Sequence, residues 1–294
     1  EYGWWAVLDA REVGAQPLGV KRFGQEMVFW RKDDGAVVAQ SDRCPHRGTK
    51  LSPGKVKDGC IECPFHGFRF DDAGACTSIP AHPDRRIPTS MRVATWPVRE
   101  AHGFLWLWVD ETREPTAELP WFEELGDDWS VGGFEATWSS HFTRCVENQL
   151  DYAHLAFVHE KTIGRFVREE ADWQVESGPL GREGAGTEFV AFGSPDAEDM
   201  GIEWREPNIW VNRLGPKMRI TAMFVPVDED TTKIYLRTWQ KFATLPGLAW
   251  AFQKANALLN RRILNEDESV VQFQTPRIAE LGINERLVPS DEPI

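Results

Sequence analysis

The chain lacks any apolar run long enough to cross a bilayer. Its longest apolar runs, FLWLWV at 104–109 and GLAWAF at 247–252, fall far below the roughly 20 residues that a membrane-spanning helix needs. It also begins with EYGWW rather than with Met, so a targeting segment ahead of it would not be visible. We therefore expect a cytoplasmic protein with no membrane partner.

Basic residues are scarce relative to acidic ones. The 294 residues include 33 Lys and Arg against 46 Asp and Glu, which gives a formal net charge of −13. An overall field of this sign repels phosphate groups, so we expect no nucleic-acid partner, although a local basic patch stays open. The same balance is compatible with an acidic enzyme that has a basic partner.

Tyrosine and cysteine are also few. Three tyrosines stand against 14 tryptophans and 17 phenylalanines, so large flat apolar side chains build much of the core or of a pocket. The five cysteines are an odd number, and Cys44, Cys60 and Cys63 fall within twenty residues of one another. This grouping fits metal chemistry in a reducing compartment better than it fits a disulfide framework.

What is present divides into two parts. Residues 1 to about 110 contain strand and turn signals, among them EMVFWR, AVVAQS, MRVATWPVRE and FLWLWV, which predict a small all-β domain. The acidic and proline-containing stretch ETREPTAELPW interrupts this pattern and is the best linker candidate. We therefore predict domains at 1–115 and 116–294, each long enough for a core of its own.

The second part is predicted to be an antiparallel sheet flanked by helices. Strand-like segments TEFVAFG, IWVNRLG, MRITAMFVPV and TKIYLRTWQKF are separated by turns such as DED at 228. One helix is predicted over CVENQLDYAHLAFVH, and a second runs from LPGLAWAF toward VVQFQTP, where Pro276 ends it. The expected fold class is α+β, with an all-β domain followed by a sheet with helices.

A first group of candidate metal ligands lies in two short loops, CPHRG at 44–48 and CPFHG at 63–67. Each loop offers one sulfur and one nitrogen, which together suit a transition metal. The closing glycine of each loop lets the backbone turn tightly beside a bulky ligand. A set of two cysteines and two histidines can hold zinc, but a zinc finger does not mix the two residue types within each half.

The two loops resemble the cluster-binding motif of Rieske proteins, whose [2Fe–2S] cluster has two cysteines on one iron and two histidines on the other. The resemblance implies that Cys44 and Cys63 bind one iron. It implies that His46 and His66 bind the other, exposed iron.

A third cysteine and two phenylalanines lie in or beside the second loop. Cys60 forms a C-x-x-C with Cys63, and we interpret Cys60 as a buried free thiol because only Cys63 is followed by Pro-Phe-His-Gly. Phe65 and Phe68 stand where Rieske proteins more often have Tyr and Trp. Loss of a tyrosine hydroxyl near the sulfurs would shift the cluster potential, because hydrogen bonds there tune it.

A second group of titratable side chains lies in ENQLDYAHLAFVH. On a helix, Glu147, Asp151 and His154 share one face. The step of five residues from His154 to His159 turns about 140° around an ideal helix. A metal shared by both histidines therefore requires the helix to end or distort between them. Glu147 and Asn148 are candidates only for supporting such a site.

A third ligand is needed, because mononuclear iron oxygenases use two histidines and one carboxylate on one face of the metal. The segment RRILNEDESVVQFQ offers Glu266, Asp267 and Glu268. Only Asp267 has apolar residues throughout at three and four positions away, so on a helix it alone points firmly inward. A carboxylate buried there needs a partner, and an iron ion would supply one.

The patterns E-N-x-x-D-x-x-H-x4-H and E-D-x-x-V-V resemble the catalytic motif and the late ligand helix of Rieske non-haem iron oxygenases. The resemblance implies a mononuclear Fe(II) on His154, His159 and Asp267. It implies that Asp151 hydrogen-bonds an iron-ligand histidine and, across a subunit boundary, a cluster histidine. It also implies a helix-grip catalytic domain and a head-to-tail homotrimer.

Insertion of one oxygen atom from O2 requires two external electrons per turnover, and the cluster passes electrons singly. The chain has no G-x-G-x-x-G after a strand, so we expect electrons from a separate NAD(P)H-dependent reductase, directly or through a ferredoxin. The expected function is that of a terminal oxygenase that hydroxylates or oxidatively demethylates a small molecule.

Aromatic residues on the predicted sheet favour a hydrophobic or aromatic substrate. They are Phe189, Phe192, Trp204, Trp210, Phe224 and Trp239. The alternative reaction is cis-dihydroxylation of an aromatic ring. Two other classes stay open, a Rieske electron carrier without oxygenase activity and a zinc-stabilised binding protein. Both leave His154, His159 and Asp267 unexplained.

Overall fold

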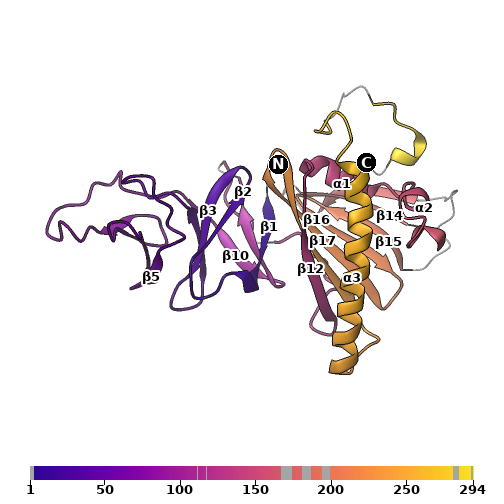
Figure 1. Ribbon diagram of the computed structural model, residues 1–294, viewed down its shortest axis with the longest axis horizontal. Coiled ribbons are helices and arrows are strands. Elements are labelled where there is room, and N and C mark those ends of the chain that lie inside the picture. Colours follow the sequence, from indigo (N-terminus) through magenta and orange to yellow (C-terminus); the bar gives the residue numbers. More distant parts are fainter. Residues whose placement is uncertain are drawn as a thin grey trace. The chain divides into compact units, whose positions relative to one another are not determined.

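The computed structural model describes residues 3–110, 112–116, 118–166, 174–180, 187–193, 199–280, 285–292 and 294. The chain divides into two compact units, Glu1–Pro115 and Thr116–Ile294 (Figure 1). Among the helices that the structure describes, none is long and apolar enough to cross a membrane.

The N-terminal unit is built from short antiparallel strands in three sheets. Their orders are β1–β11–β10, β2–β3–β4–β9 and β5–β6–β7–β8. The strands span β1 Trp4–Asp9, β2 Leu18–Arg22, β3 Gln25–Arg31, β4 Val37–Ser41, β5 Lys55–Lys57, β6 Cys60–Glu62, β7 Arg69–Phe70, β8 Cys76–Ser78, β9 Thr95–Trp96, β10 Val98–Ala101 and β11 Phe104–Trp108, and a 3-10 turn, η1, covers Ala10–Glu12. The expectation of an all-β N-terminal part is confirmed.

Large aromatic side chains fill the core of this unit. Trp5, Trp30 and Trp106 are fully buried, and every residue of β1 and β11 is buried. Strands buried on both faces are expected to be continuous apolar runs in the sequence, as WWAVLD and FLWLWV are. This core supports the strands from which the two cysteine and histidine loops extend.

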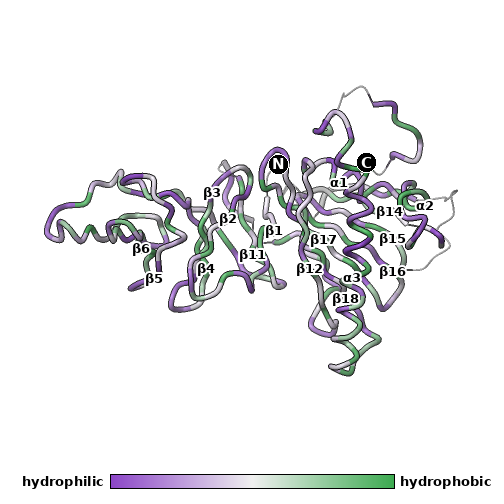
Figure 2. Tube along the Cα trace, in the orientation of Figure 1, coloured by the Kyte–Doolittle hydropathy of each residue, from purple (hydrophilic) through white to green (hydrophobic). Residues whose placement is uncertain are grey.

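The C-terminal unit contains one seven-stranded antiparallel sheet. Its order is β12–β18–β17–β16–β15–β14–β13. The strands span β12 Ser130–Trp138, β13 Gln174–Leu180, β14 Thr187–Gly193, β15 Met200–Arg205, β16 Ile209–Leu214, β17 Met218–Asp228 and β18 Thr231–Gln240. The turn between β17 and β18 falls at the predicted DED, and hydrophobic stretches run through these strands in Figure 2.

One long helix and several short ones accompany the sheet. The bounds are α1 Phe142–Leu150, α2 Leu155–Val158 and α3 Pro246–Val271, with 3-10 turns η2 Gly164–Phe166 and η3 Pro289–Asp291. α3 packs against β12 (Figure 1). Gln253 donates from Nε2 to the Ser130 carbonyl at 3.0 Å, and Asn256 donates from Nδ2 to Thr238 Oγ1 at 2.6 Å. These hydrogen bonds fix α3 on the sheet.

Two helix predictions were wrong in detail. The segment at 145–159 is not one helix, because α1 ends at Leu150 and Asp151 adopts an extended backbone with φ −77° and ψ 116°. The predicted common helical face of Glu147, Asp151 and His154 therefore does not exist. The second helix ends at Val271, ahead of Pro276, so the proline does not terminate it.

Candidate metal centres

The two loops of the N-terminal unit have the same backbone design. The amide of Gly48 donates to the Cys44 carbonyl at 2.8 Å, and the amide of Gly67 donates to the Cys63 carbonyl at 3.0 Å. Both glycines adopt the left-handed conformation, with φ of 74° and 72°. A side chain at either position would strain the turn, which explains the glycine at the end of each loop.

The four predicted ligands come together with sulfur inside and nitrogen outside. Cys44 and Cys63 are 2% and 3% exposed within an apolar cluster, whereas His46 and His66 are exposed and their rings lie 4.7 Å apart. Burial and the neighbouring Cys63 raise the pKa of the Cys44 thiol to about 11. A metal is needed to hold such a thiol as a thiolate. The arrangement fits an iron–sulfur cluster with an exposed histidine side.

Residues beside these loops differ in part from expectation. Cys60 is half-buried rather than buried, and its Sγ lies 3.6 Å from Thr77 Oγ1. Phe68 stacks on His46 with 4.6 Å between ring centroids, and Phe65 lies 3.8 Å from the His66 ring. Both phenylalanines thus supply apolar contact to the histidines, without a hydroxyl or an indole nitrogen.

In the C-terminal unit, three side chains converge. His154 and His159 stand at the two ends of α2, and Asp267 lies on α3. Asp267 Oδ1 is 3.3 Å from His154 Nε2 and 2.9 Å from His159 Nε2. One ligand atom from each residue lies within 4.8 Å of the others. Because α2 ends at Val158 and His159 has left helical geometry, with φ −102° and ψ 22°, the two imidazoles are not held at the angle that one continuous helix would impose.

Buried polar atoms without hydrogen-bond partners lie where the three side chains converge, as expected for a metal site. Asp267 Oδ1 and His154 Nε2 are buried without a hydrogen-bond partner among the described residues, although they lie close together. Leaving such atoms unpaired is costly. A transition metal holds nitrogen and oxygen ligands at about 2.0–2.2 Å, so two ligands at a right angle are about 3 Å apart. The observed separations fit that requirement.

The pKa shifts of His154 and Asp267 also indicate a metal site. Burial acts to lower the pKa of His154, but Asp151 and Asp267 outweigh it and raise the pKa to about 9. Burial acts to raise the pKa of Asp267, and the two histidines reverse this and lower it. Without a metal, Asp267 is thus a buried carboxylate that needs positive charge on both sides. A divalent cation can take the place of the imidazole protons.

Asp151 lies beside His154, as predicted. Its Oδ1 accepts from the Ala153 amide at 2.7 Å, so the side chain shapes the turn that leads into α2. Its Oδ2 lies 3.5 Å from His154 Nδ1, too far for a good hydrogen bond but close enough for charge to act. The other two predicted neighbours point elsewhere: Glu147 pairs with Arg144 at 2.8 Å, and Asn148 accepts from Gln149.

Glu266 was missed by the sequence reasoning. Its Oε2 lies 3.0 Å from His159 Nδ1 and accepts from Thr162 Oγ1 at 2.6 Å. Each histidine of the site thus has one carboxylate near Nδ1 and Asp267 near Nε2. The signal was present, because a metal-bound imidazole needs a partner for its second nitrogen and Glu266 directly precedes Asp267.

The aromatic side chains predicted to wall a pocket are mostly buried in the sheet. Trp204, Trp210, Phe224 and Trp239 are each less than a tenth exposed. Trp210 donates to the Gln149 carbonyl at 3.1 Å, which ties β16 to the end of α1. The side chain of Phe192 lies outside the described part of the chain, and Phe189 is half-buried. Contact between these residues and a substrate stays a prediction.

Comparison with known proteins finds a family match for each of the two units. Residues 3–97 match the Rieske [2Fe–2S] domain, and residues 138–292 match the vanillate O-demethylase oxygenase C-terminal domain. By family, the chain therefore belongs to the Rieske non-haem iron oxygenases, with a Rieske [2Fe–2S] domain ahead of a sheet-rich C-terminal domain. Within that class, it belongs to the family of the vanillate O-demethylase oxygenase C-terminal domain.

Individual relatives cover different shares of the chain. "Protein TIC 55, chloroplastic" of Pisum sativum is 36% identical over 162 residues, which is 53% of this chain and 29% of that protein. Methylxanthine N1-demethylase NdmA of Pseudomonas putida is 28% identical over 284 residues, 90% of this chain and 76% of that protein. The structure of NdmA from Pseudomonas putida CBB5 superposes with a TM-score of 0.83 at 25% identity, covering 99% of this chain and 86% of that one. The chain spans about a third of the length of the first curated relatives.

Proposed function

We propose that the chain is the terminal oxygenase of a multicomponent system and that it binds Fe(II) through His154, His159 and Asp267. The observation that carries this proposal is the convergence of the three ligand atoms within 4.8 Å. Two histidines and one carboxylate on one face are the ligand set of non-haem Fe(II) oxygenases. Bound there, Fe(II) would supply the activation of O2.

The surrounding residues have distinct tasks. Asp267 would supply one negative charge to a divalent metal held there, and the two neutral imidazoles would supply none. Glu266, 3.0 Å from His159 Nδ1, holds that imidazole ring with its Nε2 inward, and Asp151, 3.5 Å from His154 Nδ1, acts on the His154 ring through its charge. His159 and Asp267 are almost fully buried, which limits access of water on the protein side.

The [2Fe–2S] cluster is proposed to bind to Cys44, Cys63, His46 and His66 and to deliver electrons singly. The electrons would come from a separate NAD(P)H-dependent reductase, directly or through a ferredoxin. This is supported by the absence of a dinucleotide-binding glycine fingerprint in the sequence.

The proposed reaction is hydroxylation or oxidative demethylation of a hydrophobic or aromatic small molecule. The similarity to a methylxanthine N1-demethylase over 90% of the chain supports a demethylase or monooxygenase outcome. Ring cis-dihydroxylation is the competing outcome, and product mass separates the two. One added oxygen or a lost methyl supports the proposal, and two added oxygens favour the alternative.

The proposed assembly is a cytoplasmic homotrimer in which Asp151 connects the cluster of one subunit to the iron of the next. The position of Asp151 beside His154 supports this role. Analytical ultracentrifugation of the cluster-loaded protein tests the assembly, because a monomer would leave the cluster without a neighbouring iron.

Metal counting tests the site itself. The fully loaded protein is expected to contain three irons per chain, two in the cluster and one in the mononuclear site. His154→Ala should reduce the count to two while the visible and EPR spectra of the cluster persist. A count of two in the unaltered protein would instead indicate an electron carrier, and a colourless protein with one zinc would indicate a structural site.

A further inference from the structure

The sheet of the C-terminal unit has one charged face and one neutral face. Side chains alternate between the two faces along a strand, and residues that pair directly across neighbouring strands share a face. In β12, β15, β16, β18 and in β17 as far as its bulge at Pro226, every charged residue falls on one face by this register. They are Glu135, Glu203, Arg205, Arg213, Arg219, Lys233 and Arg237. We call this face of the five strands the outer face, and the opposite one the inner face.

Charged side chains of the outer face form ion pairs with one another and with the segment ahead of the sheet. Arg213 lies 2.6 Å from Glu203 and 2.8 Å from Glu124. Lys233 lies 2.6 Å from Glu135, its neighbour on the adjacent strand. These side chains point away from the inner face, so their charges are not available to a molecule bound there.

Helices α1 and α3 cover the inner face. Trp210 of this face donates to the Gln149 carbonyl at the end of α1 at 3.1 Å, and Asn260 of α3 donates from Nδ2 to Thr238 Oγ1 at 3.2 Å. Asn260 lies seven residues before Asp267, which is about two helical turns, so the two side chains lie on the same side of α3 and about 10 Å apart along its axis. The inner face is therefore the face of the sheet that lies toward the proposed iron site.

Two amide side chains on this side have unused hydrogen-bonding groups. The side chain of Asn212 forms no hydrogen bond within the described part of the chain, and Asn260 Oδ1 accepts none there. Asn212 pairs with Ile220, which in turn pairs with Thr238, so these three residues form one row across the inner face. Asn212 and Ile220 are half-buried, whereas the residues of the next row are each less than a tenth exposed, namely Leu236, Ala222, Trp210 and Trp204. A ligand can therefore reach the inner face at Asn212 and Ile220.

Cations are not available on this side of the sheet. Arg144 is the basic residue of α1, and it is already paired with Glu147 and Glu285, each at 2.8 Å. The basic residues of α3 are all exposed; they are Lys254, Arg261 and Arg262. A carboxylate placed against the inner face would lose its hydration without gaining a cation from the protein, and this loss is costly. A neutral polar group loses much less.

We propose that the substrate is an uncharged molecule with a polar edge, and that Asn212 and Asn260 select it by forming hydrogen bonds to that edge. This inference rests on the proposed function, whose reacting group would lie toward Asp267. A carboxamide or a lactam suits two amide side chains, because it offers both a donor and an acceptor. A site built to hydrogen-bond a substrate group rejects an analogue that lacks the group, since its own polar atoms are then left unpaired.

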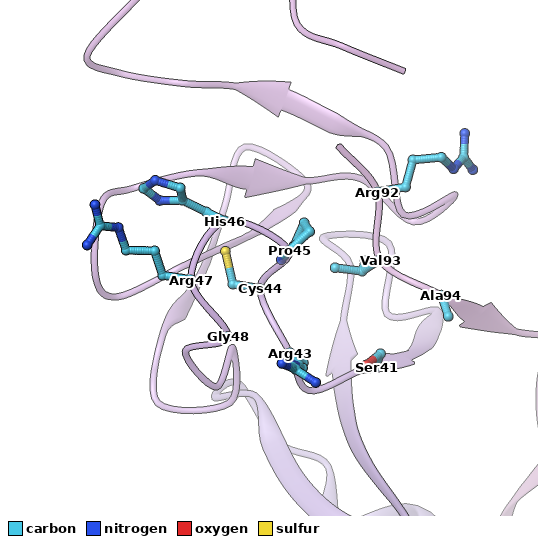
Figure 3. Close-up of a pocket in the computed structure, with 10 residues that line it drawn as sticks. All are labelled: Ser41, Arg43, Cys44, Pro45, His46, Arg47, Gly48, Arg92, Val93 and Ala94. Atoms are coloured by element: carbon cyan, nitrogen blue, oxygen red, sulfur yellow. The ribbon is translucent and has the colours of Figure 1, made fainter. Parts of the chain in front are cut away.

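The test needs a readout that is local to the proposed iron site. In the N-terminal unit, Arg43, Arg47 and Arg92 line a cavity of about 410 Å³ beside Cys44 (Figure 3). An anionic probe is attracted to such a group of cations, so its binding to the protein as a whole would not report on the inner face. Binding is therefore followed through the difference spectrum of Co(II) in the mononuclear site of the full-length, cluster-loaded protein.

Three probes with the same ring and methoxy group separate charge from hydrogen bonding. They are 4-methoxybenzamide, 4-methoxybenzoate and methoxybenzene. We expect 4-methoxybenzamide to bind more than about tenfold more tightly than 4-methoxybenzoate, because the carboxylate is desolvated without a cation. It should bind about threefold to tenfold more tightly than methoxybenzene, which is the range that one or two neutral hydrogen bonds give.

Variants on the two faces assign the effect to the two amides. Asn212→Leu and Asn260→Leu should each weaken binding of 4-methoxybenzamide about threefold to tenfold and leave binding of methoxybenzene unchanged, whereas a loss of structure would weaken both. Asn212→Lys adds a cation to the inner face and should shift the preference toward 4-methoxybenzoate. Val131→Lys is the matched control, because Val131 is exposed on the outer face, and it should keep the preference of the unaltered protein.

Three results would overturn the inference. They are a failure of 4-methoxybenzamide to bind, binding of 4-methoxybenzoate that is equally tight or tighter, and an unchanged ratio of the amide and methoxybenzene affinities in both leucine variants. The iron count of the unaltered protein tests the proposed function separately. Three irons per chain together with the wrong order of affinities would reject the substrate class alone, whereas two irons per chain would reject the proposed function and this inference with it.

Discussion

Glu266 offers the sharpest test of how the proposed iron site is built. The change is Glu266→Leu, which removes the carboxylate that receives His159 Nδ1 at 3.0 Å. A hydrogen bond to a charged group contributes about 1.5–3 kcal/mol. Each 1.4 kcal/mol corresponds to a factor of about ten in an equilibrium constant. Glu266 is 21% exposed, so solvent weakens the interaction, and we expect metal affinity to fall about tenfold to thirtyfold.

A graded series makes this prediction specific. Glu266→Gln keeps an acceptor but loses the charge, so its loss should be about threefold to tenfold. Thr162→Val removes only the hydroxyl that donates to Glu266 Oε2, and its loss should be about threefold or less. Glu268→Gln is the control, because it neutralises a carboxylate on the same helix that does not contact either histidine.

The assay is titration of the protein, loaded with its cluster but stripped of the mononuclear metal, with Co(II). The visible bands of Co(II) report the ligand geometry as well as the affinity. The reasoning is wrong if Glu266→Leu binds Co(II) within twofold of the unaltered protein, or if Glu268→Gln is affected as strongly. A change in band shape in Glu266→Leu would show that the His159 ring has turned.

Three further predictions concern other residues. Asp151→Asn should keep both metals, because an amide oxygen can still accept from the Ala153 amide, but should lose substrate oxidation coupled to NADH; unchanged turnover would reject the bridging role. Burial raises the pKa of Cys145 to about 12, so the thiol is neutral at pH 8 and should resist iodoacetamide in the native protein, as mass spectrometry can check. Arg144→Leu removes a buried guanidinium that pairs with Glu147 and Glu285, and it should lower the free energy of unfolding in urea by about 2–3 kcal/mol; a change below 0.5 kcal/mol would contradict this account.

The cluster loops could be predicted from sequence because their chemistry is local. Each loop brings its cysteine, histidine and glycine within five residues, and the turn that unites them is closed by a hydrogen bond inside the loop. The positions of Cys44 and Cys63 in the apolar core follow from the strands on either side. Little information from distant parts of the chain is needed.

The proposed iron site could not be predicted from local sequence patterns alone. Helical periodicity placed Asp151 inside a helix, but its carboxylate accepts from the Ala153 amide and so competes with the helix for a backbone donor. The apolar neighbours of Asp267 correctly predicted that its side chain is buried. The same criterion excluded Glu266 from the site, although Glu266 contacts His159, more than a hundred positions away in the sequence. A contact at that separation leaves no periodic trace in either segment.

The way α3 is seated connects the proposed iron site to the sheet. The helix is fixed to β12 near its beginning by Gln253, while Asp267 lies close to its other end. A side chain at Gly132 on β12 would place its Cβ 2.7 Å from the Cβ of Gln253 and force the helix outward. A larger residue at Gly132 is therefore expected to weaken metal binding at the proposed iron site without touching any of its three ligands.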